Sequence, residues 1–131
     1  MFSFGKSFAQ AKINCCPVYK GKILVDNSYK TMGGKLVPRA EISSKRRAVY
    51  SASPGVVASM DTSAIQRIYI RVEYLNYTYT YENIKSSECF VGQNIKTGML
   101  VGRLEEGENL YLSISDGKRL IHPESVLSCK E

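Results

Sequence analysis

Apolar and polar positions alternate most clearly between residues 68 and 74. Ile68, Ile70 and Val72 take every second position, and polar or amphipathic side chains stand between them. A period of two is that of a β-strand with one apolar face. Residues 77–81 repeat the pattern, with tyrosines on one face and threonines on the other. We therefore predict a hairpin with its tip at residues 75–76.

Turn-forming residues divide the rest of the second half into short strands. Glycines at Gly92, Gly98 and Gly102 separate apolar stretches and permit sharp reversals. Pro123 ends the last strand and permits a helical turn. No stretch has a long helical period, so the predicted fold class is mainly β, an antiparallel sheet or sandwich with little helix. The further strands expected are 49–52, 56–60, 100–104, 109–115 and 120–121, with turns at 53–55 and 116–117.

Residues 1–35 are the least regular part of the chain. A strand is expected at residues 22–25, stopped by the turn formers at 26–28, and a turn or hinge at residues 33–34. Residues 41–47 have no firm period and are expected to form a loop. A chain of 131 residues suits one domain. We divide it into a basic N-terminal extension, 1–35, which packs on the domain or contacts a partner, and a β domain, 36–131.

Basic residues concentrate in the first third. Residues 1–50 hold ten Lys or Arg against two acidic residues, whereas residues 51–131 hold eight against ten. Such a surface suits plain solvation, an anionic polymer such as cell-wall teichoic acid, or an acidic partner. Residues 45–47 form the one basic cluster, which we expect at a loop tip in solvent. Nucleic acid is not the expected partner, because most tyrosines lie away from the lysines and no recognition helix is readable.

The four cysteines, Cys15, Cys16, Cys89 and Cys129, lack the C-x-x-C spacing of a zinc knuckle or a redox motif. We interpret them as reduced structural residues, with a disulfide and a metal site as the alternatives. No apolar run is long enough to span a bilayer, and the N-terminus lacks the apolar stretch of a signal peptide. We expect synthesis in the cytoplasm, with incorporation into an assembly or virion as one route outward. The final compartment stays open.

Five short motifs follow one another in the second half. They are V-Y-S-A-S-P-G-V-V at 49–57, Y-E-N-I at 81–84, V-G-Q-N-I-K-T-G-M-L-V-G at 91–102, N-L-Y-L-S-I at 109–114 and I-H-P at 121–123. In this order they resemble the V-Y-A-x-x-x-G-V-V, Y-x-H-L, V-G-Q-x-V-x-x-G-x-x-I-G, H-L-H-F-E-I and V-D/N-P motifs of LytM/lysostaphin-type zinc endopeptidases. The resemblance covers about residues 37–127. It implies a β core built on the duplicated hybrid motif of these peptidoglycan endopeptidases.

The resemblance also implies which positions carried chemistry. In that family an H-x-x-x-D motif and the second His of H-x-H hold zinc, and two further histidines assist catalysis. By position, the zinc ligands fall on Val37, Glu41 and Tyr111, and the assisting histidines fall on Asn83 and Asn109. Val has no donor atom, and neutral Tyr and Asn are poor ligands and weak bases. We therefore predict a degenerate peptidase with no catalytic residue, no metal site and no cofactor.

An inactive domain of this type can keep its groove and bind. Its relatives are expected to hold cell-wall peptide or glycan, to dock on another hydrolase, or to form rings in envelope-spanning machines. We predict a binding or scaffolding module at the cell envelope, with peptidoglycan or a protein partner such as a hydrolase, alone or in a homo- or hetero-oligomer. Drift after the loss of catalysis is the alternative explanation of these positions. The candidate binding residues are Glu41, Tyr79, Tyr81, Asn83, Asn109 and Tyr111.

Two other functions remain open. One is a structural component of a phage tail or of a secretion or injection apparatus. The other is a biotinyl or lipoyl carrier, which shares the glycine-punctuated motif around residues 92–102 and presents a modified lysine at a hairpin tip. Lys118 is the one candidate lysine, and it lacks the flanking Met or Asp of such carriers. The single histidine, His122, lies in the ending motif and is expected to have a structural or surface role.

Overall fold

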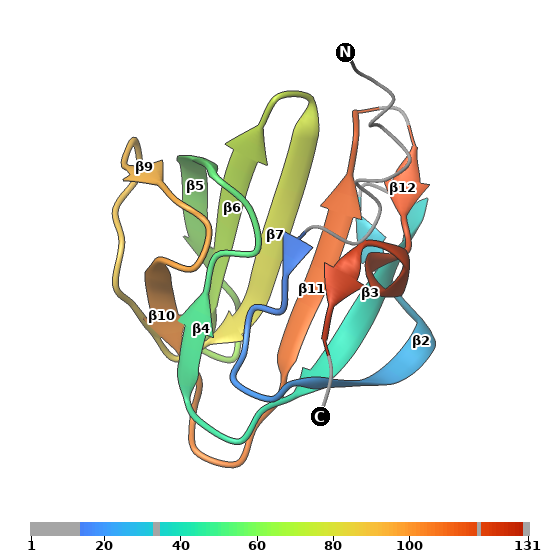
Figure 1. Ribbon diagram of the computed structural model, residues 1–131, viewed down its shortest axis with the longest axis horizontal. Coiled ribbons are helices and arrows are strands. Elements are labelled where there is room, and N and C mark those ends of the chain that lie inside the picture. Colours follow the sequence, from blue (N-terminus) through green and yellow to red (C-terminus); the bar gives the residue numbers. More distant parts are fainter. Residues whose placement is uncertain (1–13, 33–34, 118, 130–131) are drawn as a thin grey trace.

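The computed structural model describes residues 14–32, 35–117 and 119–129. Its main element is an antiparallel sheet in the order β2-β3-β11-β7-β6-β5-β9, with β12 paired to β11 (Figure 1). The strands of this large sheet are β2 (Lys22–Met32), β3 (Lys35–Ser43), β5 (Gly55–Thr62), β6 (Ile68–Tyr74), β7 (Tyr77–Ile84), β9 (Asn94–Ile95), β11 (Leu110–Ser115) and β12 (Leu120–Ile121).

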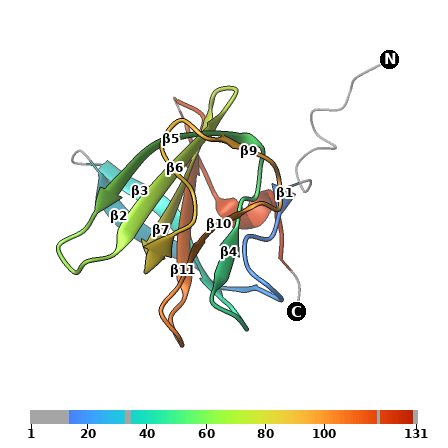
Figure 2. The same ribbon diagram turned by 90° about the vertical axis from the view of Figure 1, so that its left-hand side faces the viewer.

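A second layer lies on one side of the large sheet, where Figure 2 shows β4 and β10 with β1 beside them. The smaller sheet has the order β4-β10-β8, and β1 pairs in parallel with β13. The described part of the chain contains no helix long and apolar enough to cross a membrane. The elements of this layer are β1 (Asn14–Cys15), β4 (Ala48–Tyr50), β8 (Ser86–Ser87), β10 (Leu100–Arg103), the 3-10 turn η2 (Pro123–Ser125) and β13 (Leu127–Ser128).

The core fills the space between the two layers. Ile70 and Val72 of β6 are fully buried, and Leu110 and Leu112 of β11 follow the same alternation. Side chains that point the other way from the same strands are more polar, as the period of two requires. The predicted fold class, mainly antiparallel β with little helix, is confirmed. The predicted β6–β7 hairpin is also present, with Leu75 at its tip in the left-handed region at φ 58°.

Two predictions about the first 47 residues were wrong. The turn formers at residues 26–28 do not end a strand, because β2 continues to Met32 along β3. Register shifts between Ile23 and Ser28 accommodate them as bulges, which a long hairpin tolerates. Residues 41–43 belong to β3 and not to a loop. The turn predicted at residues 33–34 lies outside the described residues.

The segment from residue 14 to residue 32 is part of the same fold. β1 pairs with β13, Val18 forms a bridge with Val49, and β2 extends the large sheet. The predicted domain boundary at residue 35 therefore falls between the two strands of one hairpin. The expectation of four reduced cysteines was wrong, since Cys16 and Cys129 form a disulfide. The free thiols are those of Cys15 and Cys89.

Candidate functional site

Three neighbouring strands gather the polar candidates at one face of the large sheet. Tyr111 of β11 stands opposite Glu41 of β3 on one side and opposite Glu82 of β7 on the other. Directly opposed residues in antiparallel strands have Cβ atoms about 4.5–5.5 Å apart, so their side chains interact. Asn83 and Asn109 stand beside this row, one residue beyond Glu82 and one residue before β11.

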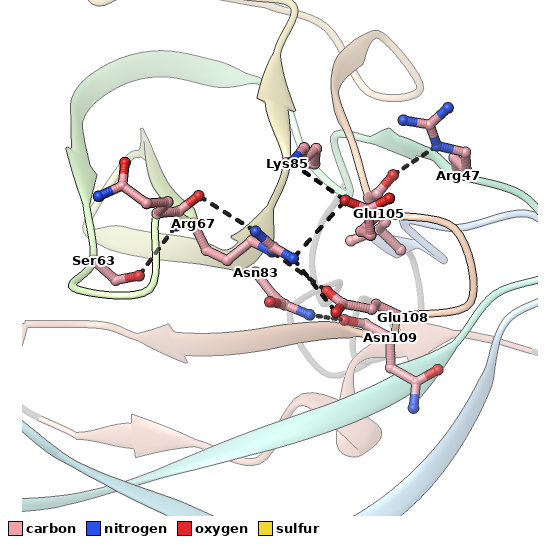
Figure 3. A network of polar contacts seen from close by, with 10 residues as sticks. Arg47, Ser63, Arg67, Asn83, Lys85, Glu105, Glu108 and Asn109 are labelled. Carbon is pink, nitrogen blue, oxygen red and sulfur yellow. Dashed lines mark hydrogen bonds and ion pairs between the residues drawn. The ribbon is translucent and has the colours of Figure 1, made fainter.

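The amide groups of this cluster hydrogen-bond to neighbours within the chain. Asn109 donates from Nδ2 to Oε2 of Glu41 at 2.8 Å. Asn83 donates from Nδ2 to the main-chain oxygen of Asn109, also at 2.8 Å (Figure 3). The three residues come from positions up to 68 residues apart in the chain. Their hydrogen bonds join the edge of β3 to the start of β11 and the end of β7.

Asn83 holds its position because β7 contains a bulge there. The register between β6 and β7 shifts between Ile68 and Ile70, and Asn83 has φ 72°. A non-glycine residue in the left-handed region is uncommon, and Asn is among the residues that tolerate it best. The bulge turns the Asn83 side chain toward Asn109, which a regular strand position would not do.

Arg39 and Glu82 complete the cluster, and sequence reasoning did not single out either. Nη1 of Arg39 lies 3.5 Å from Oε1 of Glu82, and its guanidinium lies 4.2 Å from the ring centre of Tyr111. Glu82 is almost fully buried, so its charge needs the opposite charge nearby. Burial raises the pKa of Tyr111 above 10.0, and the negative charge of Glu41 adds to this while Arg39 opposes it. The Tyr111 hydroxyl is therefore neutral at pH 7.

A second polar network supports the loop that presents Asn109. Arg67 contacts Glu108 through Nε at 3.4 Å and through Nη2 at 3.5 Å. Glu105 lies 4.0 Å from Arg67 and 3.3 Å from Lys85 (Figure 3). The ion pair with Lys85 is the largest cause of the lowered pKa of Glu105. Arg67 thereby ties the β10–β11 loop to the loop before β6, a pairing that no local sequence pattern indicates.

Two predicted binding residues lie in the core instead of at the polar face. Tyr79 is 4% exposed and Tyr81 is 0% exposed, so neither ring offers a surface to a ligand. The Tyr81 hydroxyl accepts a hydrogen bond from the main-chain N–H of Ala52 at 2.8 Å. Burial raises the pKa of Tyr81 to about 12. The prediction that these two tyrosines supply aromatic contacts is not supported by their burial.

The positions that align with the zinc ligands do not fit a metal ion. Val37 and Glu41 lie in the continuous strand β3, where four residues span about 13 Å. Catalytic zinc needs about three donors that each lie about 2.0–2.3 Å from one ion. Among the residues that the structure describes, no three His, Cys, Asp or Glu side chains come together in this way. His122 is elsewhere, with Nδ1 3.6 Å from Glu124.

No protein-family model matches this chain, and no curated protein matches it. Solved structures do resemble it. Csd3 from Helicobacter pylori shares 20% identity at a TM-score of 0.71 over 92% of this chain and 36% of its own. A chain of the SpoIIQ–SpoIIIAH pore-forming complex shares 12% identity at a TM-score of 0.69, over 89% of this chain and 92% of its own. Lysostaphin shares 11% identity at a TM-score of 0.64, over 87% of this chain and 53% of its own.

These likenesses establish the fold and confirm the predicted resemblance at that level. The chain has the fold of LytM/lysostaphin-type peptidases. It spans about a third of the length of Csd3. The fold is also that of a chain in a pore-forming complex, so proteins of this architecture include an assembly component.

Proposed function

We propose that this domain is a non-hydrolytic member of the LytM fold that works by binding or scaffolding at the cell envelope, with a protein as its partner. The observation that carries the proposal is the hydrogen bonding among residues that align with one zinc ligand and with the two assisting histidines of the peptidases. Asn109 donates to Glu41, and Asn83 donates to the main-chain oxygen of Asn109, so these polar groups bind one another.

The chemistry of these side chains opposes hydrolysis. Activating water at neutral pH requires a metal ion or a base with a pKa near 7. Tyr111 is neutral there, and the amides of Asn83 and Asn109 do not take up protons. Glu41 is the one carboxylate at an aligned ligand position, and it accepts a hydrogen bond from Asn109.

The same side chains suit recognition of a peptide chain. Amide, carboxylate, hydroxyl and guanidinium groups lie next to one another on a rigid sheet, and each can exchange a hydrogen bond for one with a ligand. The occurrence of this fold in the SpoIIQ–SpoIIIAH pore-forming complex supports a protein as the partner. Peptidoglycan is the second candidate. The resemblance to peptidoglycan endopeptidases suggests it, lysostaphin shares the fold, and the polar side chains of the cluster can form hydrogen bonds with wall peptides.

The experiment combines zinc, hydrolysis and binding measurements on the purified chain. Isolated peptidoglycan is incubated with the protein, with and without added zinc, and released amino groups and sedimented protein are measured. We expect no new amino groups in either condition. Co-sedimentation is compared with the double variant Asn109→Ala/Tyr111→Ala. The matched control is Asn76→Ala/Tyr77→Ala, which changes the same residue types at the exposed tip of the β6–β7 hairpin.

Each result has a distinct meaning. Co-sedimentation that survives salt and fails only in the Asn109→Ala/Tyr111→Ala variant would assign the cluster to wall binding. A chain that stays in the supernatant points to the protein partner. One tightly held zinc per chain together with released amino groups would overturn the proposal.

A role as a structural part of a phage tail or secretion apparatus is a variant of scaffolding. It predicts a stable oligomer, which sedimentation velocity measures directly, and a monomer at all concentrations would count against it. The carrier alternative rests on Lys118, which lies outside the described residues. An intact mass without a cofactor adduct would remove it.

A further inference from the structure

Exposed basic side chains form a surface beside the first residues of β2. Two segments meet there, the turn before β2 and the β3–β4 loop. The main-chain N–H of Lys45 lies 3.4 Å from the oxygen of Tyr19. Ser43 donates from its hydroxyl to the oxygen of Lys22 at 3.4 Å. We call this surface the basic end, and its exposed side chains are Tyr19, Lys20, Lys22, Lys45, Arg46 and Arg47.

The cations of the basic end are held in place by local contacts. The Arg46 guanidinium lies 4.3 Å from the ring centre of Tyr19, and the Lys20 ammonium lies 5.7 Å from it. The N–H of Arg46 donates to the Ser44 hydroxyl at 3.1 Å, which fixes the loop. Arg47 donates from Nε to the oxygen of Leu104 at 2.8 Å.

Three of these cations have no carboxylate partner among the described residues. Within the described ranges no carboxylate forms an ion pair with Lys20, Lys45 or Arg46. The nearby acidic loop uses Glu105 and Glu108 to bind Arg67 and Lys85 instead. A cluster of unneutralised cations creates a positive potential that attracts an anionic partner.

An open strand edge begins at the same place. β2 is the terminal strand of the large sheet, and over the described residues its one strand partner is β3. Lys22 is its first residue, and Leu24, two residues later, is 48% exposed. An exposed edge presents main-chain donors and acceptors that a second extended chain can pair with.

We propose that an extended acidic segment of a protein partner adds to the β2 edge at its Lys22 end and places its carboxylates on the basic end. The open edge selects a polypeptide, because only a polypeptide supplies a second ladder of N–H and C=O groups. The cations favour acidic side chains in the partner and increase the rate of association. The side chains of the basic end differ from those of the cluster around Glu41 and Asn109, and variants of one set leave the other unchanged, so either proposal can fail alone.

The test uses two acidic octapeptides of equal charge. One alternates Glu with Thr and can form a strand, and the other alternates Glu with Pro, which favours the polyproline II conformation over a strand and lacks an N–H donor at every second residue. Binding is measured at low salt and at about 0.3 M salt, where exposed charges are strongly screened. Two other anionic ligands are compared with the peptides. They are an oligothymidylate of eight nucleotides and vesicles of equal parts phosphatidylglycerol and phosphatidylcholine.

The variant Lys20→Ala/Lys45→Ala/Arg46→Ala removes three exposed charges from the basic end. Arg71→Ala/Lys96→Ala/Arg119→Ala removes three charges elsewhere and is the matched control. We expect the first variant to bind the Glu-Thr peptide about tenfold more weakly and the control to bind like the original chain. Equal thermal midpoints of both variants exclude a folding defect.

Hydrogen exchange of the β2 amides distinguishes strand addition from simple charge attraction. The proposal requires that the Glu-Thr peptide protects amides at the start of β2 and binds more tightly than the Glu-Pro peptide. Equal binding of the two peptides without such protection would overturn it. Tighter binding of the oligothymidylate or the vesicles than of the Glu-Thr peptide would also overturn it.

Discussion

Tyr81 is the residue on which the sequence interpretation and the structure differ most. Its pattern resembles the first residue of the Y-x-H-L motif, and it was expected at the binding surface. The structure instead buries its ring and uses its hydroxyl to accept the Ala52 N–H at 2.8 Å. Because Ala52 follows β4, this hydrogen bond joins the small sheet to the large one. The hydroxyl therefore serves the assembly of the two layers.

Replacing Tyr81 with Phe keeps the ring and removes the acceptor, so the buried N–H of Ala52 loses its partner. We expect the free energy of unfolding to fall by about 1–3 kcal/mol, as measured by urea denaturation. Tyr74→Phe is the control, because the Tyr74 side chain is exposed and its hydroxyl has no hydrogen-bond partner within the described ranges. A loss of the same size in both variants would contradict the role assigned to the Ala52 hydrogen bond.

Tyr81 also makes the free energy of unfolding decrease at alkaline pH. Burial raises the pKa of Tyr81 from 10.0 to about 12, so the folded state holds this proton more tightly than the unfolded state. The resulting stabilisation is complete below pH 10 and is lost as the pH rises toward 12, by about 2–3 kcal/mol. Urea unfolding at pH 9 and pH 11 measures this, and Tyr81→Phe should show a smaller decrease.

At the scale of elements, local patterns predicted some strands well and missed others for a physical reason. The β6–β7 hairpin is encoded by the alternation of side chains over residues 68–81, a short local pattern. β2 and β3 are set by pairing with each other, and bulges between Ile23 and Ser28 absorb residues that favour turns elsewhere. Pairing of this kind is a tertiary effect, and it overrides local propensity.

The candidate site was also predicted only in part. The order of the motifs indicated Glu41, Asn83, Asn109 and Tyr111, and the structure brings these four together. Arg39 was missed because no strand was predicted at residues 35–43, and a strand that contains residues 39 and 41 places both side chains on the same face. Its contact with Glu82 joins residues 43 positions apart, which no local pattern can show.

The extended form of β3 gives a prediction about metal binding. Restoring three ligands with Val37→His, Glu41→Asp and Tyr111→His should not create a tight zinc site, because positions 37 and 41 are about 13 Å apart along the strand. The comparison variant, Asn109→His/Tyr111→His, keeps Glu41 and places three donors at adjacent positions. Titration calorimetry with zinc should show tighter binding by the comparison variant. One tightly held zinc in the first variant would mean that β3 rearranges.

For the whole molecule, the two ends of the described chain form one substructure. β1 pairs with β13, and the disulfide between Cys16 and Cys129 lies directly after this pair on both segments. Val18, next along the chain, is buried in the core and bridges to Val49. The link therefore fixes the N-terminal segment, and through it the start of β2 and the basic end, to the C-terminal segment.

Removing the disulfide should reduce stability more than any other single change considered above. It closes a loop of 113 residues, for which the chain-entropy model gives about 5 kcal/mol, with measured values for such links of about 2–5 kcal/mol. Cys16→Ser/Cys129→Ser should lower the urea midpoint, and dithiothreitol should do the same to the original chain. Cys15→Ser, which changes an exposed free thiol, should leave the midpoint unchanged.

The redox dependence also bears on where the domain works. Disulfides persist in oxidising surroundings and are rare where thiol reductants are abundant. A large loss of stability on reduction would favour a position at or beyond the cell envelope, where scaffolding is proposed. Equal midpoints with and without reductant would mean that the strand pairs alone hold the two ends together, and the argument for an oxidising location would then fail.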